Sequence, residues 1–429
     1  MNAGNIVDAF VSDSKWNSVP AKRLFTSSKE INQGMKETNR LALTMKGVIN
    51  RSLDDLQGLQ SSDYSVYQIF EKDDLVFKLI DLENIKTSRV GIVHERGIMS
   101  PAYIRVSANS NSIYPRFYYW YFFALYLTNI YNKLGGGVRQ NLTAGDLLEI
   151  PVPLIDISLQ KQVSTFLDRE TQRIDSLIEE KQTFIKLLKE KRQALISHVV
   201  TKGLNPDVEM QDSGIEWIGQ VPKHWEKCRV KQVSSFITSG SRGWSDFISD
   251  NGNAIFLQSG DLNNELGLNL AKAKKVSPPD GAEGQRTQLQ LDDVVVCITG
   301  ANTGRVALVK ELDSTVYINQ HLSLIRPIGE KVRSKYLAYF LSSEAGSRYY
   351  ALEQYGLKEG LSLKNIAETP LMLPPVSEQT SIEKYLDKAL ATLSSLVTSV
   401  EESINLLKEH RTSLISAAVT GKIDVREAV

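Results

Sequence analysis

Two segments of the chain carry apolar side chains at seven-residue intervals. In the second segment the positions are Leu386, Leu393, Val400, Leu407 and Leu414, and in the first they are Leu167, Ile174, Leu188 and Leu195, with Lys181 at the remaining position. Leu177 and Phe184 are predicted to add a second apolar position beside the first stripe. Neither run of heptads contains an internal Pro or Gly, which predicts two long helices that each pack against another helix. We expect them within residues 155–205, which include the helix exit, and 374–429.

The chain repeats itself. Residues from Pro151 onward match residues from Pro370 onward without a gap, at an offset of 219, so that Gln160 aligns with Gln379 and LLKEKRQALIS with LLKEHRTSLIS. A weaker match extends upstream, where GVRQNLTAGDLLEIP lies over GLKEGLSLKNIAETP, and Trp16 and Trp225 head comparable segments. The chain is therefore two tandem halves. Heptads alone are equally compatible with a coiled coil between two chains, but the duplication favours an antiparallel pair within one chain, related by a pseudo-twofold repeat.

The regions between the helical segments have the pattern of mixed α/β (α+β) domains. The runs DDLVFKLI from Asp73, AIFLQ from Ala254 and DDVVVCI from Asp292 predict strands. The segments 114–131 and 332–344 predict one buried helix late in each half. Aromatic residues recur on every face of the first of these helices, which indicates core packing rather than a surface for stacking bases. We therefore expect globular domains at residues 1–154 and 206–373, the second including a linker.

Composition and charge narrow the class of protein. Apolar residues make up 42% of the chain and charged residues 23%, as in globular proteins. Lys+Arg and Asp+Glu are both 50, which excludes a protein that coats nucleic acid by bulk charge but leaves local patches open. The two cysteines, Cys228 and Cys297, are too far apart for a CxxC pair, and neither a secretory leader nor a span of membrane length is found. We expect a cytoplasmic protein.

The usual signatures of catalysis are missing from the sequence. HExxH, GxxxxGK[ST], GxGxxG and GxSxG do not occur, and neither does the (D/N)PP(Y/F) tetrapeptide of amino-methylating DNA methyltransferases. The five histidines are scattered along the chain, in a pattern typical of surface or packing roles. We therefore expect no catalytic residue, no metal site and no cofactor in this chain.

The chain resembles the specificity subunit of type I restriction-modification systems. The resemblance rests on LPPVSEQ from Leu373 and its altered copy VPLIDISLQ from Val152, each leading into a heptad helix, and on the linker from Leu195 to Val233. SPAYIRV from Ser100 and GANTGRVALV from Gly300 are similar to segments of the target-recognition domains of that family. VPLIDISLQ lacks the double proline and the glutamate of the second copy.

This resemblance implies a non-catalytic subunit with two target-recognition domains, each reading one part of a split double-stranded DNA site, and helices that set the spacer between the parts. It also implies partners: two modification subunits that bring S-adenosylmethionine and methylate adenine, and restriction subunits that use ATP and Mg²⁺. Because the two globular domains match each other only at their edges, the target is expected to be asymmetric.

Residues that could contact DNA are sought on polar, glycine-rich loops, since Arg, Lys, Asn and Gln read bases and cations hold phosphates. In the second half these loops are TSGSRGW from Thr238 and TGANTGR from Thr299, and in the first half NIKTSR from Asn84 and GGGVRQN from Gly135. The predicted DNA-binding residues are Lys86, Arg89, Arg139, Gln140, Arg242, Asn302, Thr303, Arg305 and Lys358, the last of which aligns with Arg139.

Each loop also has a simpler explanation, because Gly300 and Gly304 could serve only to form a tight hairpin. Two other functions compete with DNA recognition. One is a coiled-coil scaffold whose domains bind protein, and it predicts no DNA affinity and hence none of the salt dependence of phosphate contacts. The other is a self-contained restriction enzyme, which the missing motifs disfavour.

Overall fold

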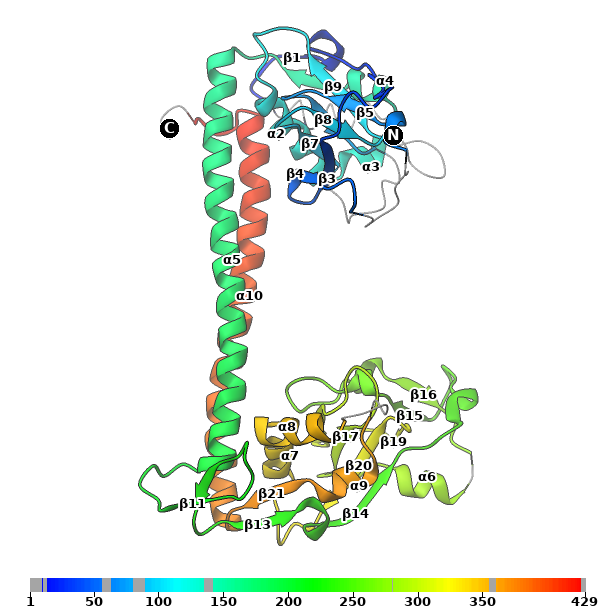
Figure 1. Cartoon of the computed structure of the whole chain (residues 1–429), viewed down its shortest axis with the longest axis vertical. Coiled ribbons are helices and arrows are strands. Elements are labelled where there is room, and N and C mark those ends of the chain that lie inside the picture. Colours follow the sequence, from blue (N-terminus) through cyan, green and yellow to red (C-terminus); the bar gives the residue numbers. More distant parts are fainter. Residues whose placement is uncertain are drawn as a thin grey trace. The chain divides into compact units, whose positions relative to one another are not determined.

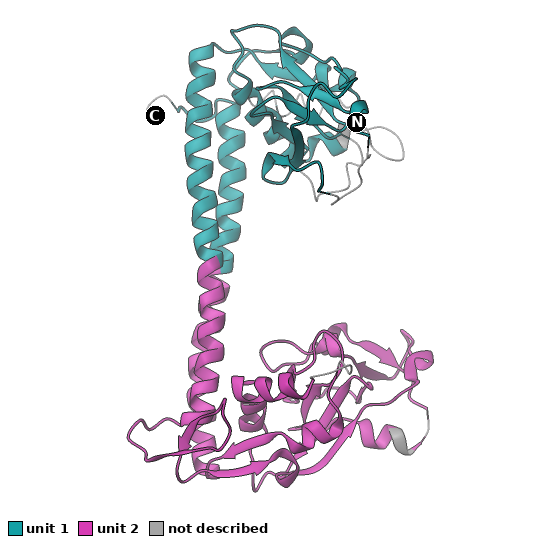
Figure 2. Ribbon diagram, viewed as in Figure 1, with its two compact units in different colours: residues 1–182, 401–429 teal, residues 183–400 magenta. Residues whose placement is uncertain are grey.

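A computed structural model describes residues 10, 14–55, 63–79, 89–134, 142–279, 281–354 and 360–425. The chain forms two compact units, each built from one globular domain and portions of two long helices, α5 (Ile157–Lys202) and α10 (Val376–Val419) (Figure 1). Unit 1 comprises residues 1–182 and 401–429, and unit 2 comprises residues 183–400 (Figure 2). Each helix is thus divided between the units, a different partition from the four consecutive segments expected from the sequence, because each globular domain packs against both helices.

In the described part of the globular domain of unit 1, the strands β1 to β9 come before the helices α2 to α4, and β10 follows them. The elements are β1 (Ser18–Pro20), η1 (Ala21–Arg23), β2 (Phe25–Thr26), β3 (Arg40–Thr44), β4 (Gly47–Arg51), η2 (Tyr64–Val66), β5 (Gln68–Phe70), β6 (Leu75–Phe77), β7 (Val90–Ile92), β8 (Gly97–Met99), β9 (Ile104–Ala108), α2 (Pro115–Leu127), α3 (Ile130–Leu134), α4 (Ala144–Glu149) and β10 (Pro151–Pro153). They form an antiparallel sheet of order β2-β9-β6-β7, a mixed sheet of order β4-β3-β8-β5 and the pair β1-β10.

Unit 2 repeats the plan with longer connections. Its elements are β11 (Met210–Asp212), β12 (Gln220–Pro222), β13 (Glu226–Arg229), η3 (Val230–Gln232), β14 (Ser234–Ser239), η4 (Trp244–Phe247), β15 (Ala254–Leu257), η5 (Ser259–Asp261), η6 (Leu270–Lys272), β16 (Lys274–Val276), α6 (Ala282–Thr287), β17 (Val294–Cys297), β18 (Val306–Leu308), β19 (Val316–Ile318), β20 (Leu322–Pro327), α7 (Ser334–Ser342), α8 (Glu344–Glu353), α9 (Leu363–Glu368) and β21 (Pro370–Leu373). The sheets are β14-β20-β17-β18, β16-β15-β19 and the pairs β11-β12 and β13-β21.

One buried helix in each unit connects the sheet to the long helices. In unit 1, aromatic side chains of α2 share a hydrophobic core with strand residues such as Phe77 and with Leu167 and Val419 of the long helices. In unit 2, α7 lies in the same way between strand residues such as Val294 and Leu386 of α10. The side chains of Phe117, Tyr118, Trp120, Tyr121 and Phe122 are at most 3% exposed, which confirms that these aromatics form core. The three predicted strands are also confirmed as β6, β15 and β17.

Within each unit the two long helices run antiparallel. In unit 1 the early residue Asp175 of α5 forms an ion pair with Arg411 near the end of α10. In unit 2 residues from the end of α5 and the start of α10 share one core, including Ile196 and Ile382. The expected mixed α/β fold with two long antiparallel helices is confirmed. No helix in the described ranges is long and apolar enough to cross a membrane.

The heptad residues line this helix pair to different degrees. Leu167, Ile174, Leu188, Leu386 and Leu393 are at most 8% exposed, whereas Leu195, Val400, Leu407 and Leu414 are half-buried. The prediction for Phe184 was wrong, since its side chain is 46% exposed. Leu177, three residues after Ile174, is half-buried, as predicted, and so is Ile178 beside it. One heptad later Ile185, four residues after Lys181, is half-buried in place of Phe184, since residues at i+3 and i+4 both lie near the face of residue i.

The sequence repeat is also a repeat of hydrogen bonds. Gln160 accepts a bond from the backbone N–H of Tyr114 (2.6 Å), directly before α2, and donates to the carbonyl of Ile155 (2.8 Å). At the same offset of 219 residues, Gln379 accepts from the N–H of Arg333 (2.8 Å), directly before α7, and donates to two carbonyls. A buried glutamine at the start of each long helix therefore fixes the N-terminus of the buried helix of its domain.

An aspartate eight residues further along each long helix holds the same buried helix. Asp168 accepts bonds from Arg116 (2.7 Å) and from the indole of Trp120 (2.8 Å). Asp387 accepts bonds from Lys335 (2.5 Å) and from the hydroxyl of Tyr339 (2.9 Å). The residue types differ on the domain side but the positions correspond, so the attachment of domain to helix has been retained while its sequence has changed.

A tryptophan at the head of each half packs at the C-terminal end of the long helix of the other half. Trp16, at the head of the first half, lies against Gly421 at the exit of α10, and Trp225, at the head of the second half, lies against Gly203 at the exit of α5. Both glycines have positive φ, +71° and +75°, the left-handed conformation that ends a helix and favours glycine.

Candidate nucleic-acid interface

The loop between β17 and β18 contains three of the predicted DNA-binding residues. Gly300 (φ +89°) and Gly304 (φ +87°) shape it, and the hydroxyl of Thr303 donates to the carbonyl of Gly300 (2.6 Å). The side chains of Asn302 and Arg305 point toward backbone carbonyls of an earlier loop: Asn302 Nδ2 donates to Ser259 (3.1 Å) and Arg305 Nη1 donates to Leu262 (2.9 Å). These two side chains therefore hold the β17–β18 loop to the segment 259–262 by hydrogen bonds. The sequence did not predict this role.

Arg242 lies on a separate turn whose conformation is tightly constrained. A side chain at Gly240 would meet the carbonyl of Ile318 at 2.1 Å, so only glycine fits there. Ser241 is buried and its hydroxyl lies 2.9 Å from that of Thr287 on α6. Between this anchor and Gly243 (φ +74°), the side chain of Arg242 is exposed. The turn places a cation on the surface, as a DNA contact requires.

Of the DNA-binding residues predicted in the first half, the structure describes Arg89. Arg89 is 2% exposed and lies directly before β7, so its guanidinium is part of the packed domain and is not available to DNA. The prediction for Arg89 is therefore not supported by its position. Lys86, Arg139, Gln140 and Lys358 lie outside the described residues.

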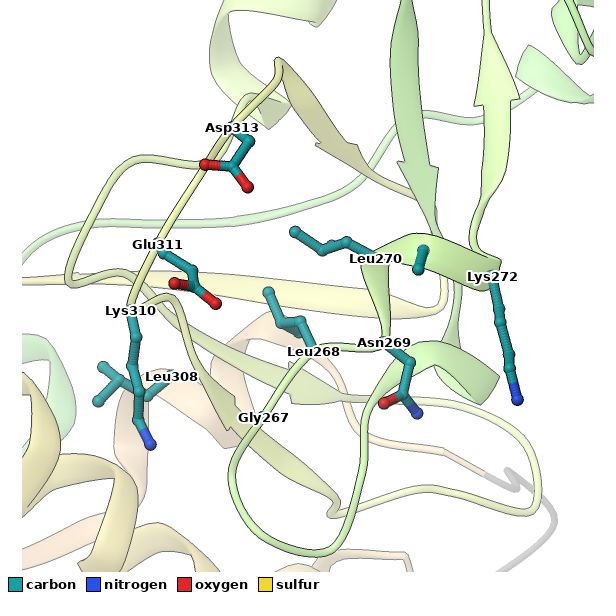
Figure 3. Close-up of a pocket in the computed structure, with 10 residues that line it drawn as sticks. Gly267, Leu268, Asn269, Leu270, Lys272, Leu308, Lys310, Glu311 and Asp313 are labelled. Atoms are coloured by element: carbon teal, nitrogen blue, oxygen red, sulfur yellow. The ribbon is translucent and has the colours of Figure 1, made fainter.

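Two hollows of unit 2 flank the loop Asn263–Gly267 and differ in charge. One, of about 510 Å³, is lined by Lys272 and Lys310 and also by Glu311 and Asp313 (Figure 3). Figure 3 shows the two acidic residues on one side of this hollow and the segment around Leu270 on the other. Its cations and carboxylates are equal in number, so it offers no net attraction for a polyanion.

The other hollow, of about 430 Å³, lies where α5 meets the loop 301–305. Three cations line it, Lys189, Arg192 and Arg305, together with one carboxylate, that of Glu265. It therefore contains Asn302, Thr303 and Arg305, which were predicted from the sequence, and two helix cations, Lys189 and Arg192, which were not. The signal for Arg192 was present in the repeat, where LLKEKR aligns with LLKEHR and thus Arg192 with Arg411.

The two thiols are not suited to nucleophilic chemistry. Burial raises the pKa of Cys228 to about 11 and also raises the pKa of Cys297. Both are therefore neutral thiols near pH 7, whereas the reactive form of cysteine is the thiolate. Among the residues that the structure describes, no group of three or more His, Cys, Asp and Glu side chains is placed to hold a metal ion.

Comparison with known proteins adds an independent line of evidence. The model of the type I restriction modification DNA specificity domain matches the chain twice, over residues 15–187 and 222–406. The specificity subunit of the type I restriction enzyme EcoBI from Escherichia coli is 22% identical over 342 residues, which cover 77% of this chain and 70% of that protein. The specificity subunit of StySPI from Salmonella potsdam is 22% identical over 285 residues, 65% of this chain but only 58% of the relative.

Solved structures share the fold at low sequence identity. A chain from a study of complex assembly and conformational transition of the type I R-M system has a TM-score of 0.71 at 16% identity, with 95% of this chain and 98% of that chain covered. The crystal structure of the HsdS subunit from Thermoanaerobacter tengcongensis gives a TM-score of 0.52 at 16% identity, with coverages of 95% and 97%.

Proposed function

The chain belongs to the family of type I restriction-modification DNA specificity proteins and, as a specificity subunit, recognises DNA rather than catalysing a reaction; we propose that its two domains read the two parts of one split, asymmetric double-stranded target. The observation that carries this proposal is the duplication itself. The same attachment by Gln160 and Asp168, and by Gln379 and Asp387, holds two domains whose exposed loops differ. Two different sets of loops on equivalent supports would read two different half-sites.

The proposal assigns chemistry to partner proteins. Two modification subunits would bind S-adenosylmethionine and methylate adenine at the site that this chain selects. Restriction subunits would supply ATP- and Mg²⁺-dependent translocation and cleavage. Such a complex acts on the DNA of a bacterial or archaeal cell, which would place this chain in the cytoplasm.

A docking surface for a modification subunit is offered by α5. Phe184 and Leu187, three residues apart and on adjacent turns, are 46% and 55% exposed in unit 2. Large apolar side chains gathered on the surface of a helix favour a protein partner, and the family assigns that partner as the modification subunit. The double variant Phe184→Ser, Leu187→Ser is expected to fold normally and to lose co-purification with the modification subunit. Leu352→Ser on α8, where the leucine is 58% exposed, is the matched control; equal loss in both would contradict this assignment.

The function is tested by mapping N6-methyladenine genome-wide in host cells with and without the gene. One gapped, asymmetric motif is expected to lose its methylation on deletion and to regain it on complementation. An unchanged map, with the neighbouring methyltransferase shown to be active, would refute the proposal and favour the protein-binding scaffold. A symmetric motif would retain DNA recognition but contradict the assignment of different half-sites to the two domains.

A further inference from the structure

The hollow between α5 and the β17–β18 loop has an excess of cations in a chain with no net charge. Lys189, Arg192 and Arg305 line it against the single carboxylate of Glu265, which accepts a hydrogen bond from Ser394 (3.2 Å). One Nη of Arg305 donates a hydrogen bond to the backbone carbonyl of Leu262 (2.9 Å). None of the three cations forms an ion pair with a described carboxylate within 4.0 Å. Positive charge that faces a concave surface without a carboxylate partner attracts an anion.

The internal repeat shows that Arg192 lacks the carboxylate partner that its equivalent has. Its equivalent in unit 1 is Arg411, whose Nη2 donates to Asp175 (3.1 Å) and whose guanidinium lies over the ring of Phe123. The residue equivalent to Asp175 in the second half is Ser394, at the same offset of 219 residues. Serine cannot neutralise an arginine. The Nε atoms of Arg192 and Arg411 are both buried without a hydrogen-bond partner, but Arg411 forms an ion pair with Asp175, and no described carboxylate lies within 4.0 Å of Arg192. The same helix position is therefore neutralised in one unit and left charged in the other.

The walls of the hollow are fixed by hydrogen bonds. Gln193, next to Arg192, donates to the carbonyl of Ser342 at the end of α7 (2.7 Å). On the opposite side, the carboxamide oxygen of Asn263 accepts the backbone N–H groups of Glu265 and Gly267 (2.9 and 2.8 Å), and Asn302 and Arg305 bind carbonyls of the same region. A site whose shape is set before binding loses less conformational entropy when a ligand is bound.

From these observations we propose that this hollow binds phosphates of the DNA backbone, with Lys189 and Arg192 of helix α5 and Arg305 of the loop as the cationic ligands. This proposal rests on the function proposed above and extends it, because it gives a long helix a direct part in holding DNA. It also predicts an asymmetry, since the equivalent position in unit 1, Arg411, is occupied by its ion pair with Asp175. Contacts to phosphate carry no sequence information, so the hollow would add affinity and leave the target unchanged.

The test uses the chain assembled with its modification subunit and the double variant Lys189→Gln, Arg192→Gln. Binding is measured on two duplexes, one with the motif found by the methylation map and one with that motif scrambled, over a range of salt concentrations. Loss of two phosphate contacts is expected to weaken binding to both duplexes alike, on the order of tenfold or more. The slope of log K against log salt is expected to fall by about 2. The methylated motif should remain the same.

Two variants serve as matched controls. Lys186→Gln removes one positive charge from the same helix at an exposed residue paired with Glu190, outside the hollow. Arg411→Gln removes the equivalent arginine of the other unit. Neither is expected to change the salt slope. Folding of every variant is checked by its thermal melting.

Other outcomes would overturn the proposal. An unchanged slope and affinity in the double variant would exclude phosphate binding at this hollow, while an intact methylation motif in the same complex would leave DNA recognition standing. A change of motif would mean that these residues read bases. Loss of the modification subunit from the complex would mean that the hollow binds protein. If the wild-type complex itself shows no preference for the motif duplex, the proposed function fails, not this extension of it alone.

Discussion

Replacing Gln379 by alanine is the sharpest test of how a domain is attached to its helix. The side chain is fully buried and makes three hydrogen bonds: it accepts from the N–H of Arg333 (2.8 Å) and donates to the carbonyls of Pro374 (2.9 Å) and Lys331 (3.2 Å). Alanine leaves all three backbone groups without this partner. Since each such bond contributes about 1 kcal/mol and an unsatisfied buried group costs about 1–3 kcal/mol, the local loss is about 3 kcal/mol or more.

Hydrogen exchange followed by mass spectrometry measures this loss where it occurs. A loss of about 3 kcal/mol corresponds to roughly a hundredfold faster exchange in α7 and at the start of α10. Gln160→Ala, the equivalent change in unit 1, is expected to accelerate exchange in α2 instead, so each variant serves as the control for the other. If Gln379→Ala left exchange in α7 unchanged, or accelerated α2 and α7 equally, the attachment would not depend on this glutamine and our reasoning would be refuted.

Three further outcomes follow from the structure. Leu386→Ala leaves a cavity at a fully buried position and is expected to lower the free energy of unfolding in urea by about 2–5 kcal/mol. Leu406→Ala, at a side chain that is 65% exposed, should lower it by well under about 1 kcal/mol. Similar losses in the two variants would contradict the described helix pairing. Gly421→Ala would place a Cβ 2.6 Å from the indole of Trp16 at a φ of +71°, so its melting temperature should fall, and an unchanged value would argue against this contact. The pKa of Asp146, at the start of α4, is lowered by the hydrogen bond from the hydroxyl of its N-cap threonine. Because the folded pKa lies below the unfolded value, its contribution to stability is present above pH 4 and is lost as the pH falls through the folded pKa, and Asp146→Asn should flatten that part of an acid titration.

The long helices and the repeat could be predicted because their signal is local and periodic. A stripe of seven-residue spacing needs no knowledge of the partner to predict that Leu386 is buried. The error at Phe184 arose from the step within the heptad, since three- and four-residue steps both occur and only the packed helix pair selects one. Gln160 and Gln379 were aligned correctly, but their function depends on backbone groups 46 residues away in the sequence.

The candidate site was less accessible to prediction for the same reason. Composition identified the polar loop with Asn302 and Arg305, but the carbonyls that bind these side chains lie 43 residues earlier in the chain. Arg89 was selected as a cation in a polar stretch, although the fold buries it. The charge of Arg192 becomes informative only when the missing carboxylate at Ser394 is seen beside the pair formed by Arg411 and Asp175.

The tryptophan at the head of each half lies against the glycine that ends the long helix of the other half. The backbone N–H of Lys15 donates to the carbonyl of Thr420 (3.0 Å), so the segment that leads into the first domain lies beside the exit of the last helix. The junction of Trp16 with Gly421 thus corresponds to the junction of Trp225 with Gly203, except that a peptide linker joins the chain through the second. Each domain therefore begins beside the end of the long helix that belongs to the other half. A rearranged chain that begins before Trp225 and joins Gly421 to Trp16 through a new peptide is therefore expected to keep both tryptophan–glycine contacts.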